Sequence, residues 1–565
     1  MSPLQSLDLP QILSTEGMRH LDAASKEYFA KANKNAPSEQ DVIQCGYTLM
    51  KEAGLALFKH VKDKALEPIA IFVGGGNNGG DGLVLAKLCI QAKIQVSVFC
   101  ITSTDKFRNE AKLALDNFLK VGGSLFDFKK ITEDPKQAPL LLHDGFKLVV
   151  DCMLGNGAKG ELRLEFASAV QVINESGLPV IAADAPTGYD SSAHACNEVC
   201  IHADETLLFG SPRMDAYVKE GGKVFGKTTV AKLSYPAEVV QQFDEKVYLV
   251  TEDTIPQLQP KRDEWGDKRV QGNPLIIAGS KDMPGAAALC TEAALRSGAG
   301  LVTLAVPQVI APILQAKLSE PVFCSLADDE NREGERRGDA LCENRGTLQP
   351  QHIPTLLHRA KHASAIAIGP GLSTNFGTVR AVLELLPQFK IPTVIDADAL
   401  NAIAMLDDAE PRCGMVFHDE KSTIQAVTEY LHNLQTPAIL TPHVREFARL
   451  FGELPKSSFD IPKCLRKIAT STNKVILLKG APTYIASPDG NVYIIPVANS
   501  GMAKGGSGDV LTGIIVALLS QGLVATEAAV LGALLHQKAG RITREELGAF
   551  SMLPSDVIKN LHKAF

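Results

Sequence analysis

Both halves of the chain alternate apolar runs with segments of helical periodicity. In the first half, apolar residues spaced as on one face of a helix occur around residues 18–28 and 49–61. Apolar runs of strand length follow at Ile69–Val73, Val96–Ile101, Leu148–Val150, Val180–Ala183 and Thr206–Phe209. Strands that alternate with helices predict a parallel sheet covered by helices.

The second half repeats this pattern and closes with two helices. Its strand candidates are Pro274–Ala278, Gly300–Ala305, Ala365–Ile368, Thr393–Ile395, Ala438–Leu440 and Val475–Leu478. The segment from Pro236 to Pro260 has few strong elements and is the candidate linker. We therefore predict an α/β chain of two domains, residues 1–240 and 241–565. Within the second, the charged and glycine-bearing segment 328–344 is predicted to be a surface insertion.

The composition is that of a soluble globular protein too long for a single core. The 565 residues are 45% hydrophobic and 21% charged, and the formal charge of −7 argues against nucleic acid as the main partner. No apolar run is long enough to cross a bilayer, and the first residues lack the pattern of a secretory signal. Eleven scattered cysteines suggest reduced thiols and a cytoplasmic location.

Residues 499–513, NSGMAKGGSGDVLTG, form the strongest chemical motif of the chain. Glycines crowd around one acid, Asp509, and an apolar helical pattern follows. Bare backbone amides at a helix start suit a phosphate, and an acid among them is suited to take a proton from an attacking hydroxyl. The alternative is a tight turn before a core helix, but such a turn needs one or two glycines and no acid.

A second glycine-rich loop, VGGGNNGGDG at residues 73–82, ends the first predicted strand. It contains the G-x-G-x-x-G pattern of dinucleotide sites, but the next strand does not end in the acid that would hold a ribose. Instead Asn77, Asn78 and Asp81 lie inside the loop. Amide and carboxylate oxygens beside bare backbone suit a hydroxyl-bearing ligand or a hard cation. Capping of the following helix is the structural alternative.

Two more polar loops follow predicted strands, at residues 151–157 and 184–190. Loops at the carboxyl ends of parallel strands share one crevice. We therefore expect Asn78, Asp151 and Thr187 to converge there, together with Asp184. Each acid taken singly also fits a helix cap or a turn.

Two further patterns are interpreted as misleading. Residues 221–228, GGKVFGKT, satisfy the P-loop expression, but no core strand precedes them and a β-branched segment follows. His194, Cys196, Cys200 and His202 could be zinc ligands, but the spacing differs from that of paired zinc knuckles, and a loop entering a strand is favoured.

In the second half, five polar motifs each follow a strand candidate: residues 278–285, 369–372, 396–401, 441–443 and 479–483. Asp396 and Asp398 suit substrate hydroxyls or a metal, His443 suits a polar edge of the substrate, and Lys479 with Thr483 suit a nucleotide phosphate. Together with residues 499–513 they predict phosphoryl transfer to a substrate hydroxyl. Asp509 would be the base, and residues 505–508 would bind the transferred anion.

These motifs resemble two known families. The loop at 499–513, DADALN at 396–401, GPGL at 369–372, TPH with Glu446, and KG with Thr483 are similar to those of the ribokinase-like NAD(P)H-hydrate dehydratases. The loops at 73–82, 151–157 and 184–188 and ADET at 203–206 resemble those of the NAD(P)H-hydrate epimerases. In this order the two sets are similar to the bifunctional NAD(P)H-hydrate repair enzymes of bacteria, over nearly the whole chain.

The resemblance implies a Rossmann-like three-layer α/β/α domain followed by a ribokinase-like α/β domain. The first would interconvert the R and S epimers of hydrated NADH and NADPH (NADHX and NADPHX), and the second would dehydrate the S epimer at the expense of ADP. The implied cofactors are K⁺ in the first domain and ADP with Mg²⁺ in the second. The expected partners are these small molecules, without nucleic acid or membrane, in a homo-oligomer.

The resemblance also implies site residues in both domains. In the first, Asp184 would carry the proton, and K⁺ would be held by Asn78, Asp151 and Thr187. The hydrate would be bound there by Asn77, Asn78, Gly79, Gly80, Asp81, Gly155, Asn156, Gly157, Ala158, Lys159, Gly160, Glu161 and Asp184. In the second domain the hydrate would be bound by Ala286, Gly371, His443 and the catalytic Asp509. ADP would be bound by Lys479, Gly480, Ala481, Pro482, Thr483, Asn499, Ser500, Gly501, Met502, Ala503, Lys504, Gly505, Gly506, Ser507 and Gly508.

The chain departs from the pattern of these families at three positions, Asn156, Ser373 and Arg445. Two other functions remain compatible with the residues. The second half could be a vitamin or sugar kinase that releases a phosphorylated product, and the first half could be a ligand-binding module without catalysis.

Overall fold

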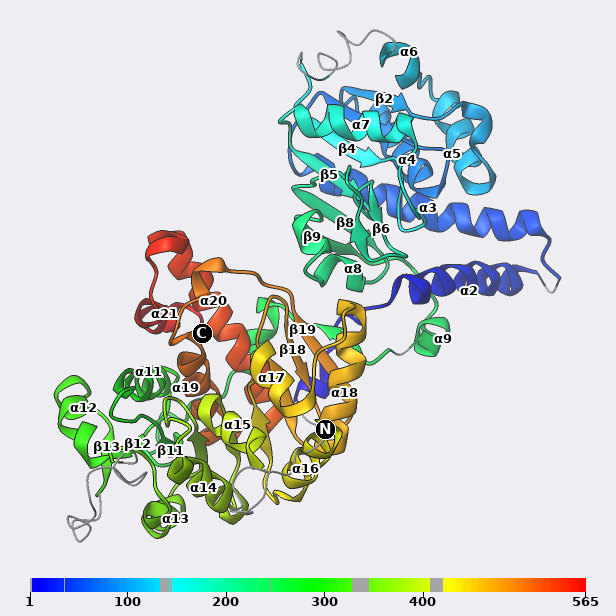
Figure 1. Ribbon diagram of the computed structural model, residues 1–565. Helices are drawn as coiled ribbons and strands as arrows, with labels where there is room; N and C mark the ends of the chain where they lie inside the picture. Colours follow the sequence, from blue (N-terminus) through cyan, green and yellow to red (C-terminus); the bar gives the residue numbers. More distant parts are fainter. Residues whose placement is uncertain are drawn as a thin grey trace. The chain divides into compact units, whose positions relative to one another are not determined.

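The chain folds into two compact units in a computed structural model that describes residues 3–34, 36–132, 142, 145–243, 245–327, 345–406 and 420–565 (Figure 1). One unit is Pro10–Val247, and the other is Tyr248–Phe565 together with the first residues up to Leu9. The sequence placed the boundary after residue 240 and assigned the N-terminus to the first domain. Leu4 explains the difference, because its side chain is buried in the core of the second unit and its N–H donates to Glu527 Oε1 at 3.2 Å. The predicted insertion at 328–344 lies outside the described residues.

The unit Pro10–Val247 is built on a parallel sheet. Its strands in the described part of the chain have the order β3-β2-β1-β4-β5-β8-β9. Its strands are β1 (Ile69–Val73), β2 (Val96–Cys100), β3 (Leu125–Asp127), β4 (Leu148–Cys152), β5 (Val180–Ala183), β8 (Glu205–Phe209) and β9 (Lys227–Ala231), with β6 (Tyr189–Asp190) and β7 (Ala195–Cys196) as a separate hairpin. Its helices are α2 (Thr15–Asn33), α3 (Glu39–Lys62), α4 (Asn77–Gln91), α5 (Asn109–Lys120), α6 (Phe128–Thr132), α7 (Leu164–Glu175), α8 (Met214–Tyr217) and α9 (Ala237–Val240). The predicted parallel sheet is confirmed, with β1 and β5 at their predicted bounds.

Alternating side chains of the strands define three layers in this unit. Ile69, Ile71 and Val73 pack with the buried faces of α3, α4 and α5, whereas Ala70 and Phe72 pack with α7 on the opposite face. Because successive strand residues point to opposite faces, a strand that is apolar throughout is buried on both sides. The result is a helix–sheet–helix sandwich.

The second unit is built on a mixed sheet whose described strands have the order β10-β19-β18-β17-β16-β15-β14-β11-β12-β13. The strands are β10 (Val247–Leu249), β11 (Pro274–Ile277), β12 (Thr303–Pro307), β13 (Val322–Leu326), β14 (Ala365–Ile368), β15 (Thr393–Ile395), β16 (Ala438–Leu440), β17 (Val475–Leu478), β18 (Thr483–Ala486) and β19 (Val492–Ile495). The helices are α1 (Pro3–Ser6), α10 (Ile255–Leu258), α11 (Pro284–Arg296), α12 (Ala311–Lys317), α13 (Ile353–Ala360), α14 (Phe376–Leu385), α15 (Ala397–Ala404), α16 (Glu420–Asn433), α17 (Val444–Phe451), α18 (Ile461–Thr472), α19 (Ser507–Ser520), α20 (Ala525–Ser551) and α21 (Pro554–Asn560).

The strands from β13 to β17 are parallel, while β18 and β19 pair antiparallel to their neighbours. The predicted strands at residues 365–368, 393–395, 438–440 and 475–478 are confirmed at their bounds. The sequence did not predict β18 and β19, which form a short hairpin outside the strand–helix alternation. The core on one face is formed by α11, α19, α20 and α21, and α19 is buried along almost its entire length.

In each sheet the strand order reverses once between two parallel strands. The reversal lies between β1 and β4 in the first unit and between β14 and β11 in the second. At such a point the loops that leave the two strands diverge to opposite faces, which opens a crevice at the carboxyl ends of the strands. The glycine-rich loop at 73–82 and the GPGL motif at 369–372 leave strands at these two points.

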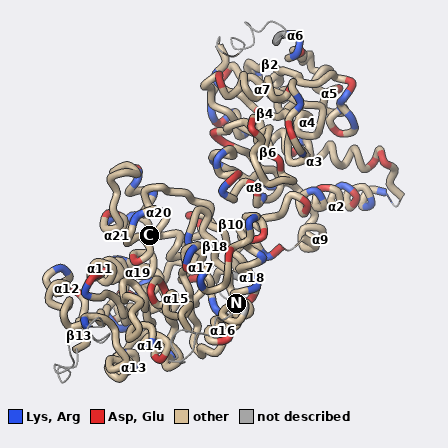
Figure 2. The backbone as a smooth tube through the Cα atoms, in the orientation of Figure 1, with Lys and Arg blue, Asp and Glu red and all other residues tan. Residues whose placement is uncertain are grey.

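The charges of the chain are mixed along both units. In Figure 2 basic and acidic residues are interspersed along the tube. Within the described ranges, no helix is both long and apolar enough to cross a membrane.

Candidate functional sites

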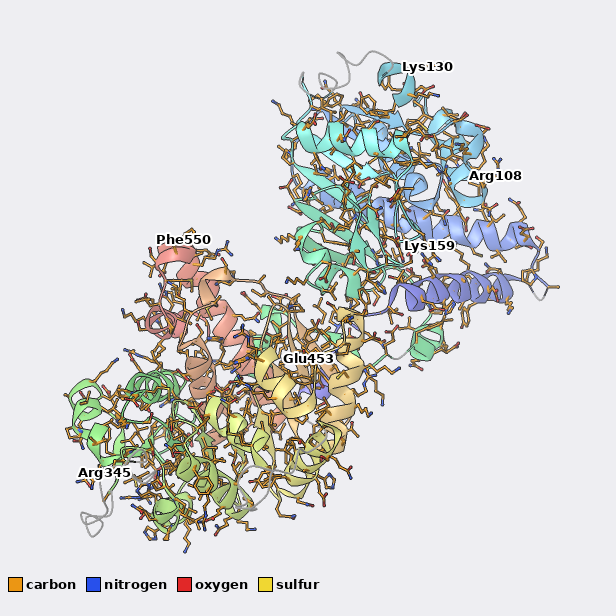
Figure 3. The ribbon with its side chains drawn as sticks, in the orientation of Figure 1. Arg108, Lys130, Lys159, Arg345, Glu453 and Phe550 are labelled. Carbon is orange, nitrogen blue, oxygen red and sulfur yellow. The ribbon has the colours of Figure 1, made fainter. Side chains whose placement is uncertain are left out.

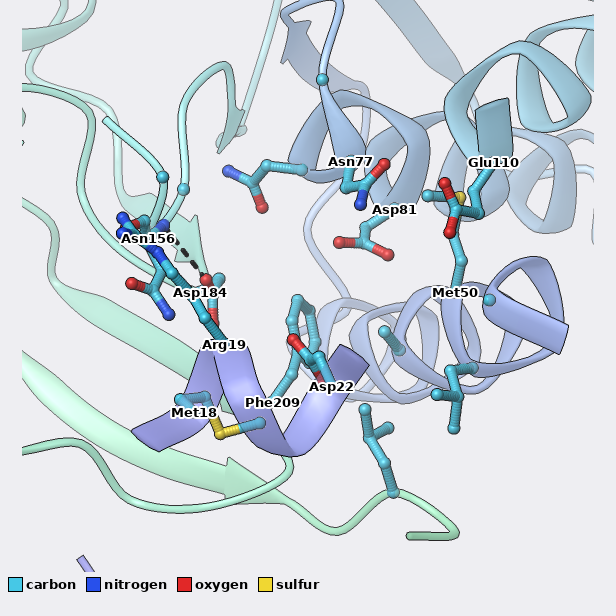
Figure 4. Close-up of a pocket in the computed structure, with 18 of the residues that line it drawn as sticks. Met18, Arg19, Asp22, Met50, Asn77, Asp81, Glu110, Asn156, Asp184 and Phe209 are labelled. Carbon is cyan, nitrogen blue, oxygen red and sulfur yellow. Dashed lines mark hydrogen bonds between the residues drawn. The ribbon is translucent and has the colours of Figure 1, made fainter. Parts of the chain in front are cut away.

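A cavity of about 460 Å³ lies at the reversal of strand order in the first unit. The glycine loop before α4, the loop after β4 and the N-terminal helix α2 all contribute to its wall (Figure 4). Among the predicted hydrate-binding residues, the ones that line this cavity are Asn77, Asn78, Asp81, Gly155, Asn156, Gly157, Ala158 and Asp184. Lys159, Gly160 and Glu161 are exposed, and the N–H of Gly160 donates to Asp190 Oδ2 at 2.6 Å.

The loop after β1 and the first turn of α4, which contains Gly79, need glycine because backbone carbonyl groups approach both closely. A Cβ atom on Gly79 would lie 1.9 Å from the carbonyl oxygen of Gly74, and one on Gly74 would lie 2.2 Å from that of Met153. A Cβ on Gly76, by contrast, would meet nothing within 4 Å. The loop is therefore folded tightly against β1 and β4 while Gly76 stays open on the cavity side.

We expect Gly79→Ala to destabilise this unit by about 2–3 kcal/mol, because backbone atoms must move to admit the methyl group. Gly76→Ala is the matched control, with an expected change within about 0.5 kcal/mol. The measurement is denaturant-dependent hydrogen exchange of the β1 and α4 amides in the full chain. Equal protection in the two variants would contradict the close approach.

Asn78 carries a buried amide that lacks a protein partner. The residue is 8% exposed, and neither its Oδ1 nor its Nδ2 makes a hydrogen bond to the described residues. Such an orphaned amide is costly unless a ligand or ion satisfies it. The Asn78 amide therefore indicates a position for a ligand oxygen or a cation beside the loop.

Asp151 and Thr187 lie together at the ends of β4 and β5. The fully buried Asp151 carboxylate accepts hydrogen bonds from Thr187 N and Thr187 Oγ1, both at 2.8 Å, and from Met153 N at 3.1 Å. Burial raises the pKa of Asp151 to about 6 even though these three donors lower it. The structure therefore brings two of the three predicted potassium ligands into direct contact.

Asp184 is held in a backbone conformation that residues other than glycine seldom adopt, with φ at +67°. The buried Arg213 donates to both its carboxylate and its backbone carbonyl. Asp184 Oδ2 also accepts from Asn156 N at 3.2 Å. A Cβ on Gly155 would lie 3.2 Å from both Asp184 Oδ2 and Asn78 Cγ, so these two predicted site residues flank Gly155. Backbone strain of this kind is typical of functional sites.

Sequence analysis missed several charged residues at and beside this cavity. Asp22 and Lys26, from α2, and Glu110, from α5, line it, whereas Arg213 follows β8 and reaches the site through its hydrogen bonds to Asp184. Arg213 lies in the loop after the predicted strand 206–209, and this position was a signal that could have identified it. Nothing in the periodicity of α2 distinguishes Asp22 from an ordinary surface acid.

Both motifs interpreted as misleading have other structures. Residues 221–223 form a 3-10 turn that leads into β9, which is the reverse of the strand-to-helix order of a P-loop. Cys196 belongs to the short strand β7, and His194 Nδ1 lies 3.4 Å from Asp215 Oδ1. In the described portion of the chain, no three His, Cys, Asp or Glu side chains are arranged to hold a metal ion.

In the second unit, α19 begins with the glycine-rich motif of residues 499–513. Gly506 precedes the helix with φ at +98°, and a Cβ on Gly505 would meet nothing within 4 Å. Asp509 stands in the first turn. Burial, and then the charge of Asp396, raise the pKa of Asp509 to about 7. The motif thus combines the start of a helix, backbone amides that are open to a ligand, and an acid with a pKa near neutrality. The first two suit the binding of a phosphate, and the acid suits proton transfer from an attacking hydroxyl group.

Behind this motif lies an ion-pair network that joins three elements. Lys479 Nζ donates to Asp396 Oδ1 at 2.7 Å and lies 3.7 Å from Glu446 Oε2. Thr512 Oγ1, on α19, donates to Asp396 Oδ2 at 2.7 Å. Both oxygens of Asp396 are thus occupied, and Asp398 accepts from Ser373 N at 2.8 Å and Asn401 Nδ2 at 3.3 Å. These two acids fix the loops in the structure rather than projecting free carboxylates.

His443 caps α17 and presents its ring at the surface. Its Nδ1 accepts from Arg445 N at 3.0 Å and Glu446 N at 3.3 Å, while Glu446 Oε2 accepts from His443 N at 2.8 Å. Burial lowers the pKa of His443 below its usual value. The neutral ring therefore carries its proton on Nε2, and Arg445 contributes its backbone to the cap.

Other predicted residues of the second site take clear positions. Gly371, at φ +64°, lies against α11, since a Cβ on it would stand 2.9 Å from that of Ala286. Ser373 also has a positive φ, +70°. Thr483 Oγ1 donates to Gly480 O at 2.9 Å. The Asn499 side chain accepts from Gly501 N at 3.1 Å.

The side chain of Lys504 is bound to backbone carbonyl groups instead of being free to bind a phosphate. Its Nζ donates to the carbonyls of Phe550 and Met552, both at 2.7 Å. Lysine at this position therefore ties the glycine-rich motif to the end of α20.

Each unit thus places a glycine-rich turn and buried acids at the carboxyl edge of a parallel sheet. This arrangement defines an α/β enzyme for small substrates that carry hydroxyl and phosphate groups.

Comparison with known proteins gives the family. Residues 274–563 match the family described as NAD(P)H-hydrate dehydratase, and residues 46–214 match the YjeF-related protein N-terminus. The bifunctional NAD(P)H-hydrate repair enzyme Nnr of Moorella thermoacetica is 36% identical, over 90% of this chain and 90% of its own. That of Thermofilum pendens is 31% identical over 91% of each chain. This chain therefore belongs to the bifunctional NAD(P)H-hydrate repair enzymes, as the sequence motifs predicted.

A solved structure is also similar to part of this chain. It is the ADP/ATP-dependent NAD(P)H-hydrate dehydratase from Bacillus subtilis, co-crystallised with ATP and Mg²⁺. The identity is 27%, the match covers 56% of this chain and 96% of the other, and the TM-score is 0.42.

Proposed function

We propose that this chain repairs hydrated NADH and NADPH. The unit Pro10–Val247 interconverts the R and S hydrates, and the second unit dehydrates the S epimer at the expense of ADP. The observation that carries this proposal is the match of both halves, in this order, to a two-domain repair enzyme over 90% of its length. The position of Asn78 and Asp184 beside Gly155, all three in the lining of the cavity, supports the epimerase half.

In the epimerase, loss and return of water at the hydrated ring carbon passes through an iminium ion. Asp184 moves the proton of that water, while Arg213 and Asn156 N hold its carboxylate in place. The open Gly76 and the Gly155 backbone leave room for the substrate beside it.

The residues at Asn78, Asp151 and Thr187 fit a potassium ion. The orphaned Asn78 Oδ1 offers a neutral oxygen, and the buried Asp151 carboxylate lacks a cation among the described residues that contact it. A bound K⁺ would supply positive charge to this buried carboxylate and to electron-rich oxygens of the substrate.

We expect KCl to raise the melting temperature of the first unit by roughly 5 °C over tetramethylammonium chloride at equal concentration. Asn78→Leu should lose this gain. Without K⁺ the variant should be no less stable than the wild type, because the substitution removes an unpartnered buried amide. Differential scanning calorimetry measures both. An equal response of variant and wild type to K⁺ would rule out Asn78 as a ligand.

In the dehydratase, Asp509 takes the proton of the ring hydroxyl as the terminal phosphoryl group of ADP moves onto it. The backbone at residues 505–508 and the start of α19 stabilise the transferred charge. Phosphate is a better leaving group than hydroxide, so the lone pair of the ring nitrogen then expels it and leaves an iminium ion. Loss of a proton from the adjacent ring carbon to water forms the ring C=C bond and restores the reduced nicotinamide. Ala286, Gly371 and His443 form the hydrate side of this site.

The nucleotide lies along residues 479–483 and 499–508. Mg²⁺ would be held chiefly by phosphate and water oxygens, because both Asp396 and Asp398 already accept hydrogen bonds, and it would supply positive charge to the phosphate groups. Lys479 forms an ion pair with Asp396. To bind a phosphate as well, its ammonium group must contact both the phosphate and the Asp396 carboxylate. A homo-oligomeric assembly stays a prediction.

The test is incubation of the pure protein with mixed hydrate epimers, ADP and Mg²⁺. Recovery of the absorbance of reduced nicotinamide from both epimers supports the proposal. A stable phosphorylated product with no recovered absorbance would favour the kinase alternative. Recovery from the S epimer alone would indicate that the first unit is a ligand-binding module without epimerase activity.

A further inference from the structure

A second carboxyl group faces the cavity of the first unit from a different element. Asp184 lines the cavity from the end of β5, whereas Asp22 lines it from α2. In Figure 4 Asp184 is drawn above and to the left of Asp22. The hydroxyl of Tyr235, another lining residue, donates to Asp22 Oδ1.

Epimerisation places a demand on both faces of the substrate ring. Water must leave from one face of the ring carbon and return to the other. A single fixed carboxyl group that acts on one face exchanges the oxygen but restores the same epimer. Inversion in a fixed orientation therefore needs one proton donor and one acceptor on opposite sides.

We propose that Asp22, oriented by Tyr235, is the second catalytic carboxyl group of the epimerase and acts on the ring face opposite Asp184. This inference rests on the proposed epimerase function and adds a catalytic residue to it.

The chemical step balances without any other reactant. Asp22 gives its proton to the hydroxyl, the C–O bond breaks with both electrons leaving in water, and the nitrogen lone pair forms the C=N bond. A water molecule then attacks the opposite face, the C=N π electrons return to nitrogen, and the proton of that water goes to Asp184. A turnover in the opposite direction returns the proton from Asp184 to Asp22.

The surroundings of the two acids differ. Arg213 pairs directly with the Asp184 carboxylate. Burial raises the pKa of Asp22, and the charge of Asp184 adds to this, against the lowering by the Tyr235 hydrogen bond, Lys26 and Arg213. Asp22 is therefore suited to begin as the acid.

The other acids of the cavity fit this role less well. Glu110 is engaged with Lys26 at 2.7 Å. Asp81 also faces the cavity, from the start of α4, but no hydroxyl group of the described residues donates a hydrogen bond to it as Tyr235 does to Asp22. Asp81→Asn is for this reason the matched comparison.

The experiment follows ¹⁸O from labelled water into each hydrate epimer, alongside epimerisation, with the full chain and no nucleotide. For Asp22→Asn we expect epimerisation to fall at least a hundredfold. Exchange into the epimer whose hydroxyl faces Asp184 should stay within about threefold of wild type. Tyr235→Phe, which keeps the carboxyl, should slow epimerisation about tenfold and leave that exchange intact.

Three outcomes overturn the inference: epimerisation at the wild-type rate in Asp22→Asn, an equal loss of exchange and epimerisation in both Asp22→Asn and Tyr235→Phe, or separation of the two rates by Asp81→Asn instead. Should Asp22→Asn fail to fold, Tyr235→Phe decides the question by the ratio of its epimerisation rate to its ¹⁸O-exchange rate. A wild-type protein that neither exchanges nor epimerises would refute the proposed epimerase function itself, which is a distinct result.

Discussion

Asp509→Asn is expected to lower the rate of ADP-dependent dehydration of the S hydrate by roughly 10²–10⁴-fold. Asparagine keeps the size of the side chain at the start of α19 but cannot accept the hydroxyl proton. The nucleotide should still bind, because the backbone of the glycine-rich motif is unchanged. Stopped reactions that monitor reduced nicotinamide, with nucleotide affinity from calorimetry, measure both quantities.

The pH dependence gives an independent check on Asp509. A base acts in its deprotonated form, and burial raises the pKa of Asp509 to about 7. The rate with bound substrates should therefore rise with pH through about 7 and level off above it, whereas residual turnover in Asp509→Asn should lack this step. Glu453→Gln, at an exposed carboxyl of the same unit (Figure 3), is the control and should behave as wild type. Full activity in Asp509→Asn would refute the base role.

Asp184→Asn is expected to lower epimerisation by roughly 10²–10⁴-fold while leaving dehydration of pure S hydrate unchanged. Asparagine is chosen because it tolerates the positive φ of this position better than alanine does. The two activities are separated by supplying R or S hydrate alone with ADP: S should be repaired at the normal rate, and R should persist.

The loss at Asp184 must be distinguished from unfolding, because the substitution leaves the buried Arg213 without its partner charge. The expected K⁺-dependent shift in melting temperature provides that check, since it would be retained only if the proposed potassium ligands Asn78, Asp151 and Thr187 stay in place. Glu175→Gln, at an exposed carboxyl on α7, is the control. Normal epimerisation by folded Asp184→Asn would assign the proton transfer to another group.

The strands and the glycine-rich loops could be predicted from the sequence because their signals are local. Ile69–Val73 is apolar throughout, since a strand covered on both faces has no solvent side. The glycines at 74 and 79 mark a close backbone approach that any larger residue would block. The hairpin of β18 and β19 escaped this logic, because its pairing departs from the strand–helix alternation around it.

Side-chain partnerships could not be predicted in the same way. Lys479 and Asp396 were both expected to face ligands, yet they pair with each other across strands β15 and β17. Lys504 lies in the nucleotide motif but secures the end of α20. Each partner lies tens of residues away in sequence, so only the closed sheet brings them together.

The amino-acid order by itself determined the two α/β halves, the loops that carry the chemistry and the two acids expected to move protons. These depend on periodicity and on the steric freedom of glycine, which act over a few residues. Only the tertiary structure decided that Arg213 bonds Asp184, that the buried Asn78 amide has no hydrogen-bond partner among the described residues, and that Asp22 lines the same cavity from α2. Such relations arise from packing between distant elements, where burial and charge act through space and leave no mark on the local pattern.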